Sequence, residues 1–113
     1  MIRTDCYLAV LKKYKEQYPD AVFEIVTRSS NSILAPSWQL LRQYKSDKIS
    51  FDEYIERYKK EILSRRSAID LMFDINHASK KYNIFLVCYE KDAKRCHRSI
   101  LKELIENIES IHE

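Results

Sequence analysis

A run of four apolar residues, from Ile84 to Val87, constrains the fold of this chain more than any other feature. A short run without polar alternation is typical of a strand that is covered on both faces, as in parallel sheets. Strand and helix patterns alternate along the rest of the sequence, which favours helices packed on such a sheet. We therefore predict an α/β fold: one domain over residues 1–113, with a small, at least partly parallel sheet covered by helices.

The remaining elements are placed by apolar periodicity and by residues that cap or stop helices. Further strands are expected at residues 2–4 and 21–27. Either Pro36 in the first turn or Ser37 as cap begins the second helix, and Ser50 caps the third. Asp92 is the expected cap of the last helix, which would place Cys96 about one turn inside it. The helices are expected near residues 7–18, 37–45, 51–62, 68–78 and 92–108.

The composition limits what the chain can bind and where it works. Three cysteines, an odd number without framework spacing, indicate reduced thiols, and we expect a cytoplasmic protein. No stretch reaches the roughly 20 apolar residues of a membrane span, so no membrane partner is predicted. The sequence contains no glycine, which excludes Gly-rich phosphate loops and the dinucleotide fingerprint.

Reactive side chains gather directly after the predicted strand 84–87, between Cys88 and Arg98. Ligands of α/β proteins bind at the carboxyl ends of strands, where helix N-termini also attract anions. A thiol near a helix N-terminus and beside His or Arg has a lowered pKa, which favours the nucleophilic thiolate. Cys96 and Cys88 are therefore candidate nucleophiles, with His97 as a further catalytic candidate. The alternative for Cys88 is that it only fills the core.

The same segment suggests an anion site. Arg98 can meet a phosphate or carboxylate with two parallel hydrogen bonds, and His97 lies beside it in the sequence. Arg28 follows the predicted strand 21–27 and would flank the same crevice if the two strands are parallel neighbours; otherwise it is a solvated surface arginine. Glu90 is either a catalytic carboxylate or the ion-pair partner that holds an arginine in place. Ser37 is counted as a further anion ligand.

Cys88, Cys96 and His97 also have the donor types of a zinc site. Their separation is longer than a two-to-four-residue knuckle, and no second Cys/His pair completes four ligands, although His77 or Cys6 could be recruited. A redox pair of the two nearby cysteines lacks the short spacing of thioredoxin-like sites. We therefore predict no metal and no cofactor.

The pattern Cys-x-Glu followed by Cys-His-Arg resembles a family known as domain of unknown function 488 (DUF488). The residues that carry it are Cys88, Glu90, Cys96, His97 and Arg98. The strand that ends in Arg28 and the stretch from Leu34 to Ser37 with the helix that follows extend the resemblance over about residues 20–108. The resemblance implies a compact α/β fold with the motif at one end of the sheet, and no reaction. Thr27 departs from it, because many members have an acidic residue there.

Two functions remain open. We expect a pocket for a small anionic ligand, phosphate- or nucleotide-like, with thiol chemistry at the motif. The alternative is a nucleic-acid-binding or protein-interaction module in which the motif is structural, and the net charge of +3 neither requires nor excludes a nucleic-acid partner. The lysine pairs are more typical of solvated helix faces. These pairs are Lys12–Lys13, Lys59–Lys60 and Lys80–Lys81.

Overall fold

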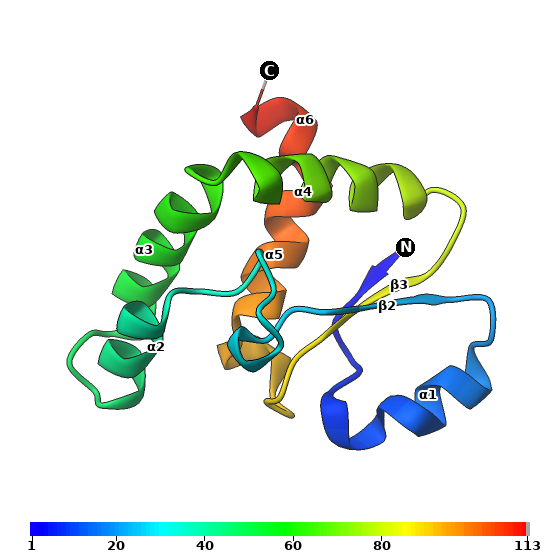
Figure 1. The fold of residues 1–113 in the computed structure, drawn as a ribbon, viewed down its shortest axis with the longest axis horizontal. Coiled ribbons are helices and arrows are strands. Elements are labelled where there is room, and N and C mark those ends of the chain that lie inside the picture. The colour runs from blue at the N-terminus through cyan, green and yellow to red at the C-terminus, as the bar shows by residue number, and fades with distance from the viewer. Residues whose placement is uncertain (113) are drawn as a thin grey trace.

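The computed structural model describes residues 1–112. The strands are β1 (Ile2–Arg3), β2 (Val22–Ile25) and β3 (Ile84–Val87). The α-helices are α1 (Leu11–Gln17), α2 (Trp38–Lys45), α3 (Phe51–Leu63), α4 (Arg66–Ala78), α5 (His97–Glu106) and α6 (Ile108–Ile111) (Figure 1). Short 3₁₀ helices occur at Leu8–Val10, Arg28–Ser30 and Ala93–Arg95. Across residues 1–112, no helix combines the length and the apolar character needed to cross a membrane.

The sheet places β3 between β1 and β2, and both pairings are parallel. Ile84 lies opposite both Ile2 and Val22, and Val87 lies opposite Ile25. Every residue of β3 is buried, which confirms the prediction of a strand covered on both faces. The predicted α/β class is confirmed as well, and the described strands form a wholly parallel sheet.

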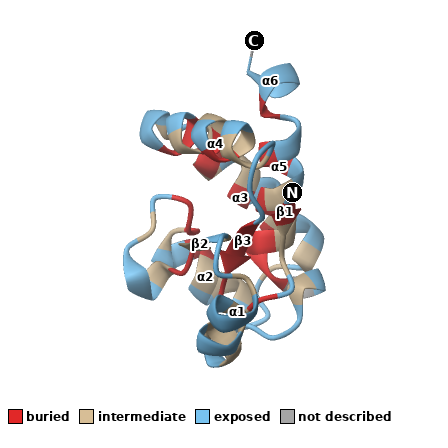
Figure 2. Ribbon diagram, turned by 90° about the vertical axis from the view of Figure 1, so that its right-hand side faces the viewer, coloured by how far each residue is buried: buried red, intermediate tan, exposed pale blue. Residues whose placement is uncertain are grey.

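Alternation along β3 divides the core between the two faces of the sheet. Ile84 and Leu86 join the larger core, to which α3, α4, α5 and α6 contribute. Phe85 and Val87 join a smaller core that includes Cys6 and is covered by α1. In Figure 1, α1 and α4 lie on opposite sides of the sheet, and Figure 2 shows the buried central strand between them.

Two predicted helix caps are present. The hydroxyl of Ser37 accepts a hydrogen bond from the backbone N–H of Leu40, and that of Ser50 accepts one from Glu53, each at 3.1 Å. Ser37, rather than a proline in the first turn, therefore begins α2. The carboxylate of Glu53 pairs with Arg57 one turn further along α3.

The last helix begins later than the sequence predicts. Asp92 accepts a hydrogen bond from the backbone, but it caps only the 3₁₀ helix Ala93–Arg95. Cys96 then has an extended backbone, with φ −121° and ψ 147°, and is the N-cap residue of α5. The expectation that Cys96 lies one turn inside the helix is therefore wrong. His97 and Arg98 are the first two residues of α5, where free N–H groups and the positive end of the helix dipole lie.

The carboxyl ends of β2 and β3 bring the predicted site segments together. The backbone N–H of Val26 donates to the carbonyl of Val87 at 2.9 Å, so the pairing continues beyond β2. Arg28 follows on one strand and Cys88 on the other. Tyr7 forms an isolated parallel bridge with Cys88, so the chain after β1 reaches the same edge. This edge is where the family resemblance places the motif.

Candidate functional site

A cavity of 360 Å³ opens at this edge of the sheet. Its lining includes Cys88, Cys96 and His97, here called the thiol cluster, whose exposures are only 3–5%. Arg28 and Glu90 also line it, so the fold brings together five of the seven predicted site residues. The two that it places outside the lining are Arg98 and Ser37.

One hydrogen bond fixes the ring of His97. Its Nε2 lies 2.7 Å from the carbonyl oxygen of Val26. A carbonyl only accepts hydrogen bonds, so Nε2 carries the proton and Nδ1 presents a lone pair in the neutral ring. Nδ1 lies 3.9 Å from Sγ of Cys88 and 3.8 Å from Sγ of Cys96. The ring also packs edge-on against Tyr58, with ring centres 5.5 Å apart. One nitrogen of a fixed imidazole therefore lies within 4 Å of both thiols.

The two thiols of the cluster differ in acidity. Contact with the Cys96 thiol lowers the pKa of Cys88 to about 3, although burial opposes ionisation. His97 and the backbone N–H of Glu90 act in the same direction. The same contact, together with burial, raises the pKa of Cys96. The environment thus favours Cys88 over Cys96 as the nucleophile.

Arg98 is fully buried and does not line the cavity. Its Nε donates to the carbonyl of Thr4 at 2.8 Å, Nη2 donates to that of Lys91 at 3.0 Å, and Nη1 donates to the carbonyl of Glu90. We call Arg98 and these three carbonyls the arginine lock. The lock ties the chain after β1 to the loop after β3. The expectation that Arg98 holds an anion does not fit this position, because the side chain is fully buried outside the cavity lining and each of its three nitrogens donates to a backbone carbonyl.

Glu90 contributes to the lock through its backbone, not through its carboxylate. The carboxylate projects to the rim of the cavity and forms an ion pair with Lys45 of α2 at 2.7 Å. About half of each side chain is exposed, so this pair is worth little stability. The expected ion pair between Glu90 and Arg98 or Arg28 is therefore replaced by one with Lys45. Lys45 was not among the predicted site residues.

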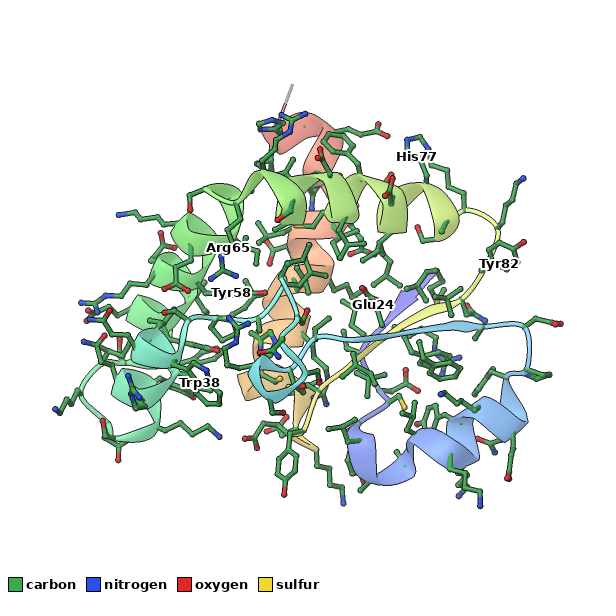
Figure 3. All side chains as sticks on the ribbon, in the orientation of Figure 1. Glu24, Trp38, Tyr58, Arg65, His77 and Tyr82 are labelled. Carbon is green, nitrogen blue, oxygen red and sulfur yellow. The ribbon has the colours of Figure 1, made fainter. Side chains whose placement is uncertain are left out.

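Ser37 stabilises the start of α2 and does not line the cavity. Besides capping α2, its hydroxyl donates to the carboxylate of Glu61 at 2.5 Å, and its backbone N–H donates to the same group at 2.9 Å. The preceding stretch is held by α3 and by the residue that precedes α4: Tyr58 donates to the carbonyl of Leu34, and Arg65 donates to that of Ala35 at 2.6 Å (Figure 3). The stretch from Leu34 to Ser37, which is part of the family resemblance, therefore positions α2 as a wall of the cavity. The predicted role of Ser37 as an anion ligand does not fit, because its hydroxyl is bonded to Leu40 and Glu61.

Of the predicted anion ligands Arg98, Arg28 and Ser37, Arg28 alone lines the cavity. It is partly buried, and Nη2 makes one long hydrogen bond, 3.4 Å, to the carbonyl of Ser32. Its buried Nε has no hydrogen-bond partner among the described residues. A guanidinium has five N–H donors, so Arg28 keeps most of them for a ligand. Thr27, which stands where many family members are acidic, caps the 3₁₀ helix Arg28–Ser30.

The aromatic wall of the cavity was not predicted from the sequence. Its members are Trp38, Tyr44, Tyr54 and Tyr89. Tyr44 and Tyr54 stack with centres 4.5 Å apart, as core packing would predict, but Trp38 and Tyr89 are 53% and 76% exposed at the cavity. A tryptophan on the first, solvent-facing turn of a capped helix is the one sequence signal that could have indicated this wall.

The two residues considered as additional metal ligands lie elsewhere. His77 is exposed on the outer side of α4, away from the sheet (Figure 3). Cys6 is buried in the smaller core on the α1 side of the sheet. The donor atoms of the thiol cluster, in contrast, all lie within 4.8 Å of one another. The fold therefore brings these three donors together although they are widely spaced in the sequence, and that spacing was the reason for predicting no metal.

The comparisons with known proteins identify the family of the chain. The profile of the DUF488-N3a family, described as the active DUF488-N3 subclade, matches residues 11–109. The matched segment contains the whole motif from Cys88 to Arg98 and every residue that lines the cavity. Neither a curated protein nor a solved structure gives a match. The chain belongs to the DUF488-N3a family, which confirms the resemblance drawn from its motifs.

Proposed function

We propose that the cavity binds a small, planar, anionic ligand of nucleotide type and that Cys88 attacks an electrophilic carbon of this ligand. The observation that carries the proposal is the thiol cluster itself, in which a fixed imidazole nitrogen lies within 4 Å of two sulfurs at a cavity wall. A cysteine beside a histidine that is oriented by a third group is the arrangement of cysteine nucleophiles. The carbonyl of Val26 is the orienting group here.

The proposed step moves one proton and exchanges one bond. Cys88 attacks as the thiolate, its proton having passed to Nδ1 of His97, and the carbonyl of Val26 stabilises the imidazolium through Nε2–H. The sulfur of Cys88 forms a bond to the ligand carbon, and the bond from that carbon to its leaving group breaks. The leaving group departs with the electron pair and takes the proton from Nδ1. Water or a second ligand then releases the product by the same exchange.

The remaining lining supports the ligand class. The volume of 360 Å³ is within the range of about 300–1,000 Å³ that is usual for small-molecule sites. The exposed faces of Trp38 and Tyr89 suit a planar ring, since aromatic side chains stack on such rings. Arg28 has free donors for a phosphate or carboxylate, whereas the charge of Lys45 at the rim is balanced by Glu90.

Thermal unfolding with a ligand panel tests the proposal. The panel contains nucleoside monophosphates and triphosphates, nucleosides without phosphate, and inorganic phosphate. We expect a phosphorylated planar compound to raise the melting temperature, because a ligand at 100 times its Kd stabilises by about 2.7 kcal/mol. Arg28→Met and Trp38→Ala should each remove most of this shift. Lys80→Met, which changes an exposed lysine outside the cavity, is the matched control and should keep it.

Absence of any shift across the panel, together with ordinary reactivity of Cys88 toward alkylating agents, would refute the proposal. The same variants separate it from the nucleic-acid alternative. The lysine pairs lie on α1, on α3 and in the turn after α4, so they belong to three separate elements. Binding of an oligonucleotide that weakens steeply with salt and depends on these pairs, but not on Arg28, would favour that alternative.

A further inference from the structure

We propose that the thiol cluster also binds one thiophilic metal ion of the Zn²⁺ class, with one coordination position open to the cavity. This inference goes beyond the proposed function, because it gives the same sulfurs a second use. The two uses compete, because coordination to a metal ion occupies a lone pair of the sulfur and slows its attack on carbon. The protein would therefore exist in a metal-free, thiol-reactive form and in a metal-bound form.

The distances from Nδ1 of His97 to the two sulfurs are close to those of a tetrahedral site. Zinc binds sulfur at about 2.3 Å and histidine nitrogen at about 2.0–2.1 Å, which at tetrahedral angles separates the two donors by roughly 3.5 Å. The observed separations of Nδ1 from the two sulfurs are 3.9 and 3.8 Å. All three donors lie within 4.8 Å of one another. A contraction of a few tenths of an ångström would bring Nδ1 to that separation from each sulfur.

His97 already has the orientation of a metal ligand. Histidine ligands donate their second ring N–H to a carbonyl or carboxylate, which fixes the tautomer and turns the other nitrogen toward the metal. Here Nε2–H donates to the carbonyl of Val26 at 2.7 Å, and Nδ1 faces the sulfurs. Cys96 is the N-cap residue of α5, and its sulfur lies 3.8 Å from Nδ1 of His97, the first residue of that helix.

The number of donors points to an open site. Structural zinc sites have four protein ligands, whereas catalytic sites have three and leave the fourth position to water or substrate. Among the described residues, the group of His, Cys, Asp and Glu donors at this location consists of the three members of the thiol cluster. All three line the cavity, so the fourth position is available to a water or to an anionic ligand held by Arg28.

The donor types select the class of metal. Two thiolate sulfurs and an imidazole suit Zn²⁺ and, among softer ions, Cu⁺, while Mg²⁺ and Ca²⁺ require oxygen ligands. The carboxylate of Glu90, which also lines the cavity, pairs with Lys45 and does not join the cluster. We therefore expect tight binding of Zn²⁺ or Co²⁺ and none of Mg²⁺.

The test uses the reduced, full-length chain after treatment with a chelator. Addition of Co²⁺ should give the intense visible bands of a tetrahedral, sulfur-ligated ion and should saturate at one ion per chain with the protein at micromolar concentration. Zn²⁺ should displace Co²⁺ and abolish the bands. Zn²⁺ should also protect Cys88 and Cys96 of the wild-type chain from alkylation, a readout that requires no substitution. Mg²⁺ at the same concentration should have neither effect.

Substitutions assign the site to the cluster. Cys88→Ser and His97→Gln should each weaken Zn²⁺ binding by at least about 100-fold, the upper end of the loss caused by removing outer-shell partners alone. Cys6→Ala is the matched control, because it removes a buried thiol on the other side of the sheet and should leave binding unchanged. Circular dichroism checks that the variants remain folded, and the protection experiment on wild type stands without them.

Several results would overturn the inference: no binding of Zn²⁺ or Co²⁺ at micromolar protein, octahedral cobalt spectra, or binding that survives both cluster substitutions. These outcomes are distinct from failure of the proposed function. If the metal does not bind but a planar phosphate stabilises the chain and Cys88 reacts rapidly, only the metal inference fails. If the metal binds but no ligand stabilises the metal-free chain and its Cys88 is unreactive, only the proposed function fails.

Discussion

The thiol cluster and the arginine lock are neighbours in the sequence, yet the fold gives them opposite tasks. Cys96 and His97 face a cavity, and their polar atoms are directed toward one another and toward Cys88. Arg98, one residue further along α5, is fully buried and binds three backbone carbonyls. A dense run of reactive residues thus divides into a part suited to chemistry and a part that holds the loop in place.

This difference shows why a motif cannot be interpreted as a list of catalytic residues. Consecutive residues in the first turn of a helix project about 100° apart, so neighbours meet different surroundings. Within the motif, the side chain with the most donors is that of Arg98, which is fully buried and does not line the cavity. Arg28, which is about 70 residues away in the sequence, is the arginine that the cavity retains. The following predictions test this division of roles, from the largest expected effect to the smallest.

Breaking the arginine lock should have the largest effect on stability. Arg98→Met keeps most of the side-chain volume but leaves three partly buried carbonyls without their donor. Each unsatisfied group costs about 1–3 kcal/mol, so the free energy of unfolding should fall by at least about 3 kcal/mol. Urea unfolding measures this loss. Arg28→Met is the matched control and should change the free energy by less than about 1 kcal/mol. Equal losses in the two variants would contradict the assigned roles.

Removing the cap of α2 should have an intermediate effect on stability and none on the thiol cluster. Ser37→Ala loses the hydrogen bond to the backbone of Leu40 and the contact with Glu61, which should cost about 1–2 kcal/mol. Thermal and urea unfolding measure this cost. Ser37→Thr retains the hydroxyl and should recover part of the stability. If Ser37→Ala instead removed ligand binding at unchanged stability, Ser37 would be a ligand residue after all.

Neutralising Glu90 should have the smallest effect. Its backbone carbonyl, not its carboxylate, belongs to the arginine lock, and the carboxylate forms an exposed pair with Lys45. Exposed pairs contribute about 0–1 kcal/mol, so Glu90→Gln should remain within this range of wild type in urea unfolding. Lys45→Met removes the other half of the pair and serves as the comparison. A loss near that of Arg98→Met would show that the carboxylate itself holds the loop.

The sequence predicts the sheet better than it predicts the site. The apolar run of β3 shows burial on both faces because a strand with no polar position has no side for solvent. The start of α5 could not be found in this way. Asp92 is a good local cap, and it does cap a short 3₁₀ helix, but cysteine is not a preferred cap residue. Arg98 is fixed to a carbonyl 94 residues away, a constraint that no local pattern contains.

The site was predicted where it depends on strand ends and missed where it depends on packing between distant elements. Cys88 and Arg28 follow β3 and β2 directly, so strand pairing alone brings them together. Lys45 and Trp38 reach the cavity because α2 is held by contacts with α3 and with the residue that precedes α4. Such contacts depend on the angles between helices, which the sequence pattern does not specify.

The central claim is that the thiol cluster activates Cys88, and site-resolved alkylation of the metal-free chain tests it most directly. Iodoacetamide labelling followed by peptide mass spectrometry gives a rate for Cys88 and for Cys6 in the same sample. Because the pKa of Cys88 is lowered to about 3, its thiolate persists as the pH falls from 8 to 5, so its rate should stay nearly constant. Burial raises the pKa of Cys6, so its rate should fall with pH. Cys96→Ala removes the contact that lowers this pKa most and should restore a pH-dependent rate at Cys88. Parallel pH profiles for Cys88 and Cys6 in the wild-type chain would contradict the account.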